Sequence, residues 1–323
     1  MKVLLTGISG FIGKKVARNL IRQNHNITAI IRPQTDLKRI NDFINEVKFI
    51  DIDLTDIETL KEFLEQTSFD AILHIGALRG GRKFSRKDFF EANVNASEQL
   101  MLNALQHNSK FIFCSSVGVY GTIPKQCPAK INTEFDDDNY YHYTKIQAEK
   151  LLDKYILRGL QAAIIRPSIT YGTNDYGFPY TLTKLVDKKM MFLPNKNIKI
   201  HLANVNLVTE TFVLLLNNSF KTGTTYNVAD YLETNLWDLV DFISKELKSK
   251  PYPENRIIGE KWFRWGEKTS KFFKSDLWKA RFQLISKSWY YDVNPLYKDL
   301  NLHHYKTIPN IKSVIDWYKE QNK

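Results

Sequence analysis

Tyr141 and Lys145 are the residues whose types and spacing most directly suggest chemistry. They are four residues apart in a segment whose pattern predicts a helix, so they share one helix face. A lysine cation near a phenol lowers the pKa of the phenol and would make Tyr141 a general acid or base near neutrality. Such a pair occurs by chance in a chain with 16 tyrosines. Its position, after a serine turn that contains Ser116, gives it weight.

A glycine-rich turn at residues 6–13 reads Thr-Gly-Ile-Ser-Gly-Phe-Ile-Gly. It lies between an apolar run at 2–5, which predicts a strand, and an amphipathic segment at 14–22, which predicts a helix. Gly7, Gly10 and Gly13 would let the backbone approach a pyrophosphate, and the helix N-terminus would offer free N–H groups. The spacing is one residue longer than the common dinucleotide fingerprint. Alone, the motif is also compatible with an ordinary strand-to-helix turn.

Residues that follow the predicted strands 27–31 and 47–50 indicate how the adenosine part of the cofactor would be bound. Folds that select NAD place an acid about twenty residues after the glycines, but this chain has Ile31 there, followed by Arg32. Arginine can bind a 2′-phosphate through paired hydrogen bonds, so the sequence favours NADP over NAD, unless Arg32 is simply solvated. Asp53 could accept a hydrogen bond from the adenine amino group. The competing explanation is that acids in this segment, such as Asp51 or Asp56, serve as caps at the surface.

Strands and helices alternate through the first half of the chain. This order predicts an α/β fold with a Rossmann-type, doubly wound parallel sheet, in which ligands bind beyond the carboxyl ends of the strands. The predicted strands are 2–5, 27–31, 47–50, 70–74, 110–114 and 162–166, and the predicted helices are 14–22, 56–66, 86–107 and 141–157.

The second half has longer loops, and predicted helices at 205–216 and 236–247. We expect residues 1–166 to form an NAD(P)-binding domain. Residues 167–323 would form mainly a smaller α/β substrate-binding domain, with about 198–218 returning to the first. The stretch 256–291 mixes basic and aromatic residues. It could contact substrate phosphate, but the pattern favours a helix with an aromatic core face and a solvated basic face.

Composition limits the class of protein. The chain has 323 residues, 43% hydrophobic and 25% charged, as in ordinary soluble enzymes. We find no apolar run of the ~18 residues that a membrane span needs and no signal peptide. The two cysteines make neither a disulfide framework nor a metal set. The sequence therefore predicts a cytoplasmic protein with no membrane partner and no metal.

The formal net charge of +11 allows three explanations. It could serve a nucleic acid, a basic pocket for a doubly phosphorylated substrate, or no function at all. Because the chain has no dense basic run and no nucleic-acid-binding signature, we expect no nucleic-acid partner.

Taken together, the motifs resemble the extended short-chain dehydrogenase/reductase family, the NAD(P)-dependent epimerases and dehydratases, best known for nucleotide-sugar epimerases. The resemblance covers nearly all of the first half and continues more loosely to the end. Besides the glycine turn and the Tyr141/Lys145 pair, it rests on Asp53-Leu54, His74-Ile75-Gly76-Ala77, Asn93-Val94, the turn at 116–121, Arg166-Pro167 and Tyr171-Gly172.

The resemblance implies a role for each matching residue. Tyr141 would be the catalytic acid/base, Lys145 would bond the nicotinamide ribose, and Ser116 would bond the reacting substrate oxygen. The remaining residues would bind or line the cofactor: Gly7, Gly10, Phe11, Ile12, Gly13, Arg32, Asp53, Leu54, Gly76, Ala77 and Arg79. The family's long helices, here about 86–107 and 141–158, commonly pair two subunits in a four-helix bundle, so the resemblance also implies a homodimer.

Three departures bear on the substrate. The 4,6-dehydratases of the family have Thr-Asp-Glu where this chain has Ser116-Val117-Gly118, so elimination of water is not expected. UDP-hexose 4-epimerases carry a substrate-binding asparagine where this chain has Ile169. The family's Val-Asp-Asp segment appears as Leu202-Ala203-Asn204.

The sequence thus predicts an NAD(P)-dependent epimerase or oxidoreductase that transfers a hydride at a hydroxyl or keto carbon of a nucleotide-linked sugar. One alternative is an NADP-dependent reductase of a non-nucleotide carbonyl substrate. Another is a non-catalytic dinucleotide-binding sensor, which the presence of Ser116, Tyr141 and Lys145 argues against. His74, His142 and Cys114 are predicted to be packing or surface residues.

Overall fold

The fold comes from a computed structural model, which describes residues 1–79, 84–263, 265 and 276–322. The chain forms two compact units. The first contains Met1–Val119, Phe135–Pro167 and Val208–Tyr226, and the second contains Tyr120–Glu134, Ser168–Leu207 and Asn227–Lys323. The segment Tyr120–Glu134 thus lies in the second unit, although the sequence placed all of 1–166 in the first. Part of the basic aromatic stretch 256–291 lies outside the described residues.

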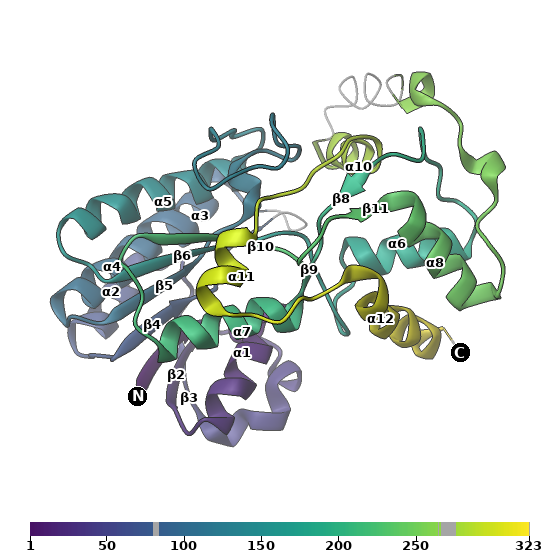
Figure 1. The fold of residues 1–323 in the computed structure, drawn as a ribbon. Helices are drawn as coiled ribbons and strands as arrows, with labels where there is room; N and C mark the ends of the chain where they lie inside the picture. Colours follow the sequence, from purple (N-terminus) through teal and green to yellow (C-terminus); the bar gives the residue numbers. More distant parts are fainter. Residues whose placement is uncertain (80–83, 264, 266–275, 323) are drawn as a thin grey trace. The chain divides into compact units, whose positions relative to one another are not determined.

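A seven-stranded sheet organises the first unit, in the order β10-β6-β5-β4-β1-β2-β3 (Figure 1). Strands β1 to β6 pair in parallel. Their apolar residues are buried almost without interruption, as expected for a sheet covered on both faces. The strands are β1 Lys2–Thr6, β2 Asn26–Ile31, β3 Val47–Asp51, β4 Ala71–His74, β5 Lys110–Cys114, β6 Ala162–Pro167 and β10 Thr224–Val228. The predicted Rossmann-type sheet is confirmed.

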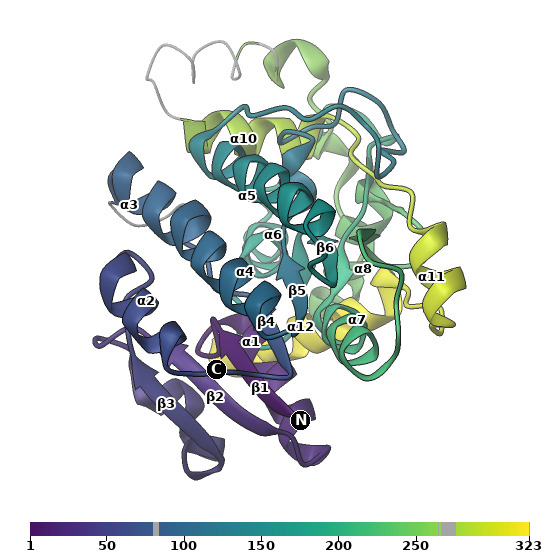
Figure 2. The same cartoon turned by 90° about the vertical axis from the view of Figure 1, so that its left-hand side faces the viewer.

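Helices cover both faces of this sheet. Figure 2 shows α2, α4 and α5 side by side on one face, where α4 contacts both α2 and α5, and Figure 1 shows α1 and α7 on the other. Asn217 at the end of α7 donates to Gln23 after α1 at 2.9 Å, which ties these two helices. The helices are α1 Phe11–Arg22, α2 Ile57–Glu65, α4 Ala96–Gln106, α5 Tyr140–Leu157 and α7 Val205–Asn217, with the 3-10 helices η1 Leu37–Glu46 and η3 Val117–Val119.

The helix predicted at 86–107 is interrupted. It consists of α3 (Arg86–Phe90), one turn of π-helix (η2, Glu91–Asn95) and α4. A π turn inserts an extra residue and turns a side chain out of the regular helical register, often near a functional site. Here it directs Asn93 into the interior, where only 1% of its surface is exposed.

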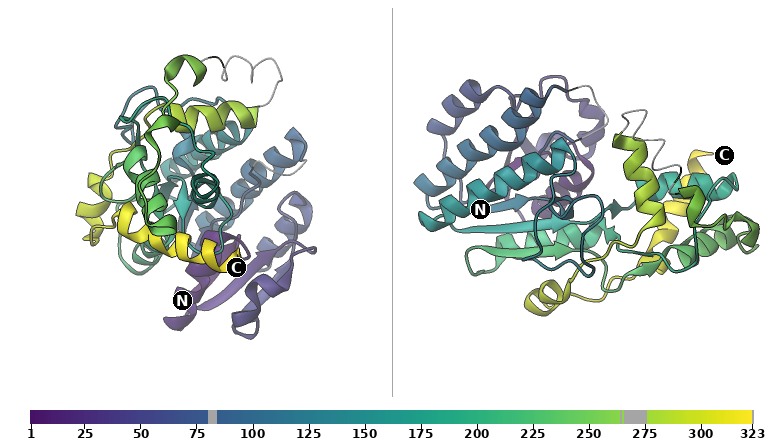
Figure 3. Two further views of the ribbon diagram at one scale, coloured as in Figure 1. Left: turned by 90° about the vertical axis from the view of Figure 1, so that its right-hand side faces the viewer. Right: turned by 90° about the horizontal axis from the view of Figure 1, so that it is seen from above.

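Three packed helices organise the second unit. α6 (Phe178–Asp187), α8 (Leu236–Lys248) and α12 (Thr307–Gln321) contact one another, as Figures 1 and 3 show. Its other elements are β7 Thr170–Tyr171, β8 Lys199–Ile200, β9 Ala203–Asn204, β11 Thr234–Asn235, η4 Glu254–Arg256, α10 Asp276–Ser286 and α11 Asn294–Leu300. Among the residues that the structure describes, no helix is both long and apolar enough to span a bilayer.

A buried ion pair fixes α5 against the sheet. The Arg166 guanidinium, on β6, donates to both carboxylate oxygens of Glu149, on α5, at 3.0 and 2.5 Å. Only 5% and 2% of the two side chains are exposed. A paired geometry of this kind satisfies the donors and acceptors of both buried groups. Since Glu149 is one turn after Lys145, the ion pair holds the part of α5 that carries Lys145.

Glu149→Gln should lower the free energy of unfolding by about 3–5 kcal/mol, because it removes the carboxylate charge that compensates the buried Arg166 guanidinium. Urea denaturation would measure the change. Lys312→Ala is the control, because it breaks an exposed ion pair with Asp316 and should cost less than about 1 kcal/mol. A loss for Glu149→Gln no larger than the loss for the control would contradict this role.

Candidate active site

The candidate residues lie along one edge of the sheet, after five adjacent strands. Ser116 follows β5, Gly76 follows β4, Gly7 follows β1, Arg32 follows β2 and Asp53 follows β3. Because these strands are parallel, their carboxyl ends meet at the same edge, where ligands of such sheets bind. Neighbouring strands therefore bring together residues that are up to 109 positions apart in the chain, from Gly7 to Ser116.

The glycines are required by close backbone contacts. Gly7 has φ +75°, and a Cβ on it would lie 2.6 Å from the backbone nitrogen of Gly76. A Cβ on Gly13 would lie well under 3.0 Å from the carbonyl oxygen of Gly7. The Gly10 N–H donates to that same oxygen at 2.9 Å. The turn after β1, the start of α1 and the turn after β4 are thus packed backbone against backbone.

This cradle fits a pyrophosphate. Helix α1 begins at Phe11 and Ile12 after its N-cap, Gly10, with no side-chain cap and no acid in its first turn. The first N–H groups and the positive end of the helix dipole are therefore available to an anion. The residues present thus suit the diphosphate of a dinucleotide.

A buried hydrogen-bond chain braces the cradle. Thr6 Oγ1 accepts from the Gly76 N–H at 2.9 Å and donates to His74 Nδ1 at 2.7 Å. His74 Nε2 then donates to Ser97 Oγ at 2.8 Å, because that hydroxyl donates to the Asn93 carbonyl. Every proton position in the chain is thereby fixed, with His74 neutral. Burial, aided by the Lys145 charge, lowers the pKa of His74 to about 3.

The residues expected near the adenosine part of the cofactor, Asp53, Leu54 and Arg32, differ in their surroundings. Asp53 Oδ1 accepts from both the backbone N–H and the hydroxyl of Thr55 at 3.0 Å, so this oxygen is used by the turn itself. Leu54 reaches Gly76, since a Cβ on Gly76 would lie 3.2 Å from Leu54 Cδ1. Arg32 is half-buried after β2, and Ile31 beside it is buried.

Tyr141, in the first turn of α5, lies close enough to Ser116 for the serine side chain to influence its pKa. Burial, with a contribution from Cys114, raises the pKa of Tyr141 to about 12, although the Arg79 charge and the Ser116 side chain oppose the rise. Arg79 is thus close enough to act on the phenol. The sequence predicted a pKa near neutrality for Tyr141. In the protein without a bound ligand the pKa is higher, because the effect of burial outweighs the charge of Arg79.

Lys145 is fully buried and bonded to the strand end rather than to Tyr141. Its Nζ donates to the Cys114 carbonyl at 2.7 Å and lies 4.7 Å from the centre of the Phe113 ring. Burial lowers the pKa of Lys145 to about 8, although Cys114 and Glu149 oppose the fall. Cys114 therefore contributes its backbone oxygen to the site, and burial raises the pKa of its thiol to about 11.

Asn93 joins the two halves of this site. Its Oδ1 accepts from the Leu78 N–H at 2.7 Å, and its Nδ2 donates to the Leu78 carbonyl and to Thr144 Oγ1. Thr144 in turn donates to the Tyr141 carbonyl at 2.8 Å. Asn93 therefore positions both the turn after β4, where Ala77 and Arg79 lie, and the first turn of α5. In the sequence, Asn93 stood out only as part of the Asn93-Val94 motif.

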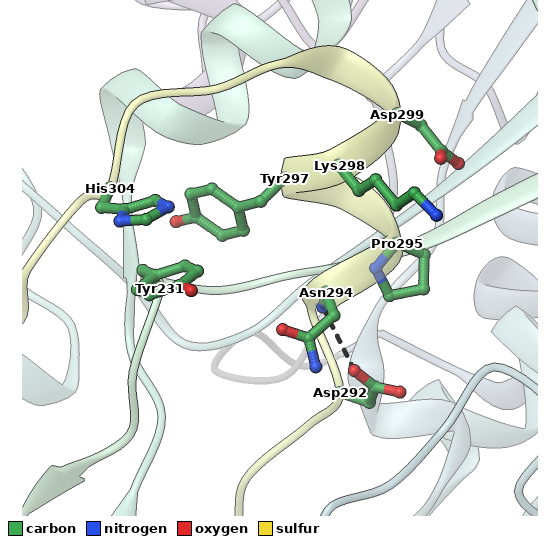
Figure 4. A pocket seen from close by; sticks show the side chains of 8 residues that line it. All are labelled: Tyr231, Asp292, Asn294, Pro295, Tyr297, Lys298, Asp299 and His304. Atoms are coloured by element: carbon green, nitrogen blue, oxygen red, sulfur yellow. Dashed lines mark hydrogen bonds between the residues drawn. The ribbon is translucent and has the colours of Figure 1, made fainter.

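A separate surface hollow lies in the second unit and contains none of the predicted site residues. On one side, the rings of Tyr231 and His304 are stacked with their centres 3.4 Å apart, and Tyr297 meets both edge-on (Figure 4). Its other lining residues are Asp292, Asn294, Pro295, Lys298 and Asp299.

Comparison with known proteins agrees with this geometry. A family model, "NAD dependent epimerase/dehydratase family", matches residues 3–229. An N-acetyl-α-D-glucosaminyl-diphospho-ditrans,octacis-undecaprenol 4-epimerase from Escherichia coli O157:H7 is 29% identical over 80% of this chain and 77% of its own. A UDP-glucose 4-epimerase from Caenorhabditis elegans is 30% identical over 47% of this chain, and the match spans about half of that enzyme.

Solved structures share the fold across the full length. A UDP-glucuronic acid 4-epimerase from Bacillus cereus in complex with NAD has a TM-score of 0.75 at 17% identity and is covered over 100% of both chains. At that identity the likeness establishes the fold, while the family match rests on sequence. The chain is therefore an enzyme of the extended short-chain dehydrogenase/reductase type and belongs to the NAD-dependent epimerase/dehydratase family.

Proposed function

We propose that this enzyme is an NAD-dependent epimerase that inverts a hydroxyl-bearing carbon of a sugar attached through a diphosphate. The observation that carries the proposal is the closeness of Ser116 and Tyr141, with Lys145 one helical turn on, at the strand edge that also holds the glycine cradle. The relatives support the substrate class, because those reported above are named for sugars linked through a diphosphate or UDP. The formal charge of +11 suits such an anion.

Each residue would have a defined task. Ser116 would hold the substrate hydroxyl, and Tyr141 would take its proton as the carbon–hydrogen bond breaks, leaving a keto sugar. A bound dinucleotide supplies the acceptor and later the donor of the hydride. After the keto sugar turns, Tyr141 would return the proton to the new alcohol. No net oxidation results, and the protein's contribution is orientation and proton transfer.

The high pKa of Tyr141 bears on this cycle. With a pKa of about 12 in the protein alone, Tyr141 holds its proton at neutral pH. The phenolate needed for the first step would therefore require additional positive charge near the phenol. Among the described residues, Arg79 already acts on the phenol, and the buried Lys145, whose pKa is lowered to about 8, is a second cation on the same helix as Tyr141.

A second candidate is an NADP-dependent reductase, and Arg32 is the observation that favours it. The buried Ile31 stands where NAD-selecting folds have an acid, and the half-buried Arg32 follows. A guanidinium there could bind a 2′-phosphate. A reductase would release its product and exchange its cofactor at each turnover, whereas the epimerase would not.

We also propose a homodimer through α4 and α5. Apolar side chains that are only partly buried support it, among them Leu102, Leu105 and Leu151, and Leu157 at the end of α5 is 88% exposed.

The cradle can be tested with Gly7→Ala. The new Cβ would meet the Gly76 backbone, so we expect NAD binding to weaken at least about tenfold. Gly223→Ala is the matched control, because Gly223 has φ +82° but its nearest neighbour would lie 3.9 Å from a Cβ. Both variants share the strain of the left-handed backbone, about 1–3 kcal/mol. Titration with NAD that shows equal affinities for the two variants would contradict the cradle.

Tyr141→Phe removes the proposed proton carrier. It should lower kcat by about 10²- to 10⁴-fold and leave NAD affinity within about threefold. Epimerisation of UDP-N-acetylglucosamine, UDP-glucose and polyprenyl-diphosphate N-acetylglucosamine would be followed by product analysis. Tyr140→Phe is the control, since the Tyr140 ring stacks on Tyr143. Full activity in Tyr141→Phe would exclude this mechanism.

Arg32→Gln separates the two candidates. If Arg32 binds a 2′-phosphate, the variant should bind NADPH at least about tenfold more weakly and NADH almost unchanged, since a charged hydrogen bond contributes about 1.5–3 kcal/mol. Fluorescence titration would give both affinities. Lys48→Gln, an exposed change in β3, is the control. Tighter binding of NADH than of NADPH by the unmodified enzyme would rule out the reductase candidate.

A further inference from the structure

The imidazole of His142 fills the side-chain position of residue 118. Gly118 lies in the turn after β5, in η3, and a Cβ built on it would lie well under 3.0 Å from Nε2 and Cδ2 of His142. No larger residue at 118 could coexist with the ring in this place. Gly118 and His142, which are 24 positions apart, therefore form one complementary unit, with the small residue making room for the large one.

This position borders the groups that would touch the reacting carbon. The Gly118 N–H donates to Ser116 Oγ at 3.0 Å. The ring of His142 lies 5.8 Å from that of Tyr141, between centres. In the 4,6-dehydratases of the family, from which this turn departs, the position of Gly118 carries a glutamate. An ionisable imidazole, supplied by α5, thus stands where those enzymes have a carboxylate.

The ring is oriented by the cap of α5. His142 Nδ1 lies 2.6 Å from Asp138 Oδ1 and 2.7 Å from Asn139 Nδ2, and Asn139 Nδ2 donates to Asp138 Oδ1 at 3.0 Å. Because a carboxylate only accepts, the bond to Asp138 requires Nδ1 to donate. Asn139 Oδ1 accepts from the His142 N–H at 3.0 Å as the N-cap. Only 13% of the His142 side chain is exposed. The imidazole therefore has both a fixed place and a fixed orientation, as in catalytic Asp–His pairs.

The bond to Asp138 determines what Nε2 can do. In the neutral ring the bond to Asp138 keeps the proton on Nδ1, so Nε2 then presents a lone pair and accepts hydrogen bonds. Among the residues that the structure describes, none is seen to hydrogen-bond Nε2. A ring that served only to fill space would not need an aspartate to set its tautomer.

We propose that His142 is a substrate-binding residue whose Nε2 accepts a hydrogen bond from a second hydroxyl of the sugar, next to the carbon whose oxygen Ser116 and Tyr141 hold. Asp138 is then a positioning residue that keeps Nε2 an acceptor. The site selects sugars with a free hydroxyl beside the reacting carbon and rejects those in which it is missing or alkylated. This inference rests on the proposed function and names a specificity determinant of that site.

Two substitutions separate binding from space filling. His142→Phe keeps a ring beside Gly118 but removes the acceptor, and His142→Gln places an amide oxygen within reach of the position of Nε2. With UDP-N-acetylglucosamine, UDP-glucose or polyprenyl-diphosphate N-acetylglucosamine, whichever the enzyme epimerises, His142→Phe should raise KM at least about tenfold with kcat within about threefold. His142→Gln should recover most of the affinity. NAD binding should stay unchanged in both variants.

The opposite pattern would overturn the inference. If the ring only fills space, His142→Phe will behave as the unmodified enzyme and His142→Gln will be the weaker variant. A fall in kcat without a change in KM would equally exclude a binding role. His107→Phe, at an exposed histidine after α4, is the control and should change neither constant. If the unmodified enzyme epimerises none of the three substrates, the proposed function itself fails.

Asp138→Asn tests the positioning role by a spectroscopic signature. In the unmodified protein, ¹⁵N NMR of labelled histidine should show the His142 ring with its proton on Nδ1. The variant should shift the tautomer towards Nε2–H and raise KM in parallel. An unchanged tautomer would exclude the role given to Asp138.

Discussion

The closeness of three backbone segments is the constraint on which the rest of the site depends. Gly7, Gly13 and Gly76 bring the ends of β1 and β4 and the start of α1 into contact at distances that exclude a Cβ. Their approach leaves the first N–H groups of α1 open to an anion. The buried hydrogen-bond chain from Thr6 through His74 and Ser97 to Asn93 fixes the Gly76 backbone in this contact. Each of the side chains in it has hydrogen-bond partners. A dinucleotide site here is thus a consequence of how the sheet edge is packed.

The proton affinities of Tyr141 and Lys145 depend on how deeply the two side chains are buried. Desolvation moves the pKa of Tyr141 up to about 12 and that of Lys145 down to about 8, because burial disfavours the charged form of each group, so the two values move apart. The surroundings hold both groups in place: the Cys114 carbonyl receives Lys145, and Asn93 joins Leu78 to Thr144. Asn93 accepts a hydrogen bond from Ser97 in the buried chain and donates one to Thr144 at the start of α5. It therefore links the glycine cradle to the helix that carries Tyr141.

The sequence predicted the parts of the fold that follow from local chemistry. Buried parallel strands are continuous apolar runs, so β1 to β6 were found within a residue or two, and so was the glycine turn between β1 and α1. The π turn at Glu91–Asn95 was missed, because the hydrogen bonds between its Asn93 and Leu78 join residues 15 positions apart, which no helical periodicity records. The sequence also did not indicate that Tyr120–Glu134, which follows β5 and η3, belongs to the second unit. Nor did it indicate that Lys145 donates to a backbone oxygen, that of Cys114. Spacing gives the face of a helix but does not tell what that face meets.

The turn after β5 shows how a local comparison can mislead. Against the Thr-Asp-Glu of the dehydratases, Ser116-Val117-Gly118 looks like a loss of function, since two acids are replaced by valine and glycine. In space the position of Gly118 is not empty: His142 occupies it from another element and is held there by Asp138. A polar group has therefore been exchanged for one of different charge, reach and hydrogen-bonding sense. The chemistry of this site is set by which side chain fills the space beside Ser116, and that is a property of the packed fold.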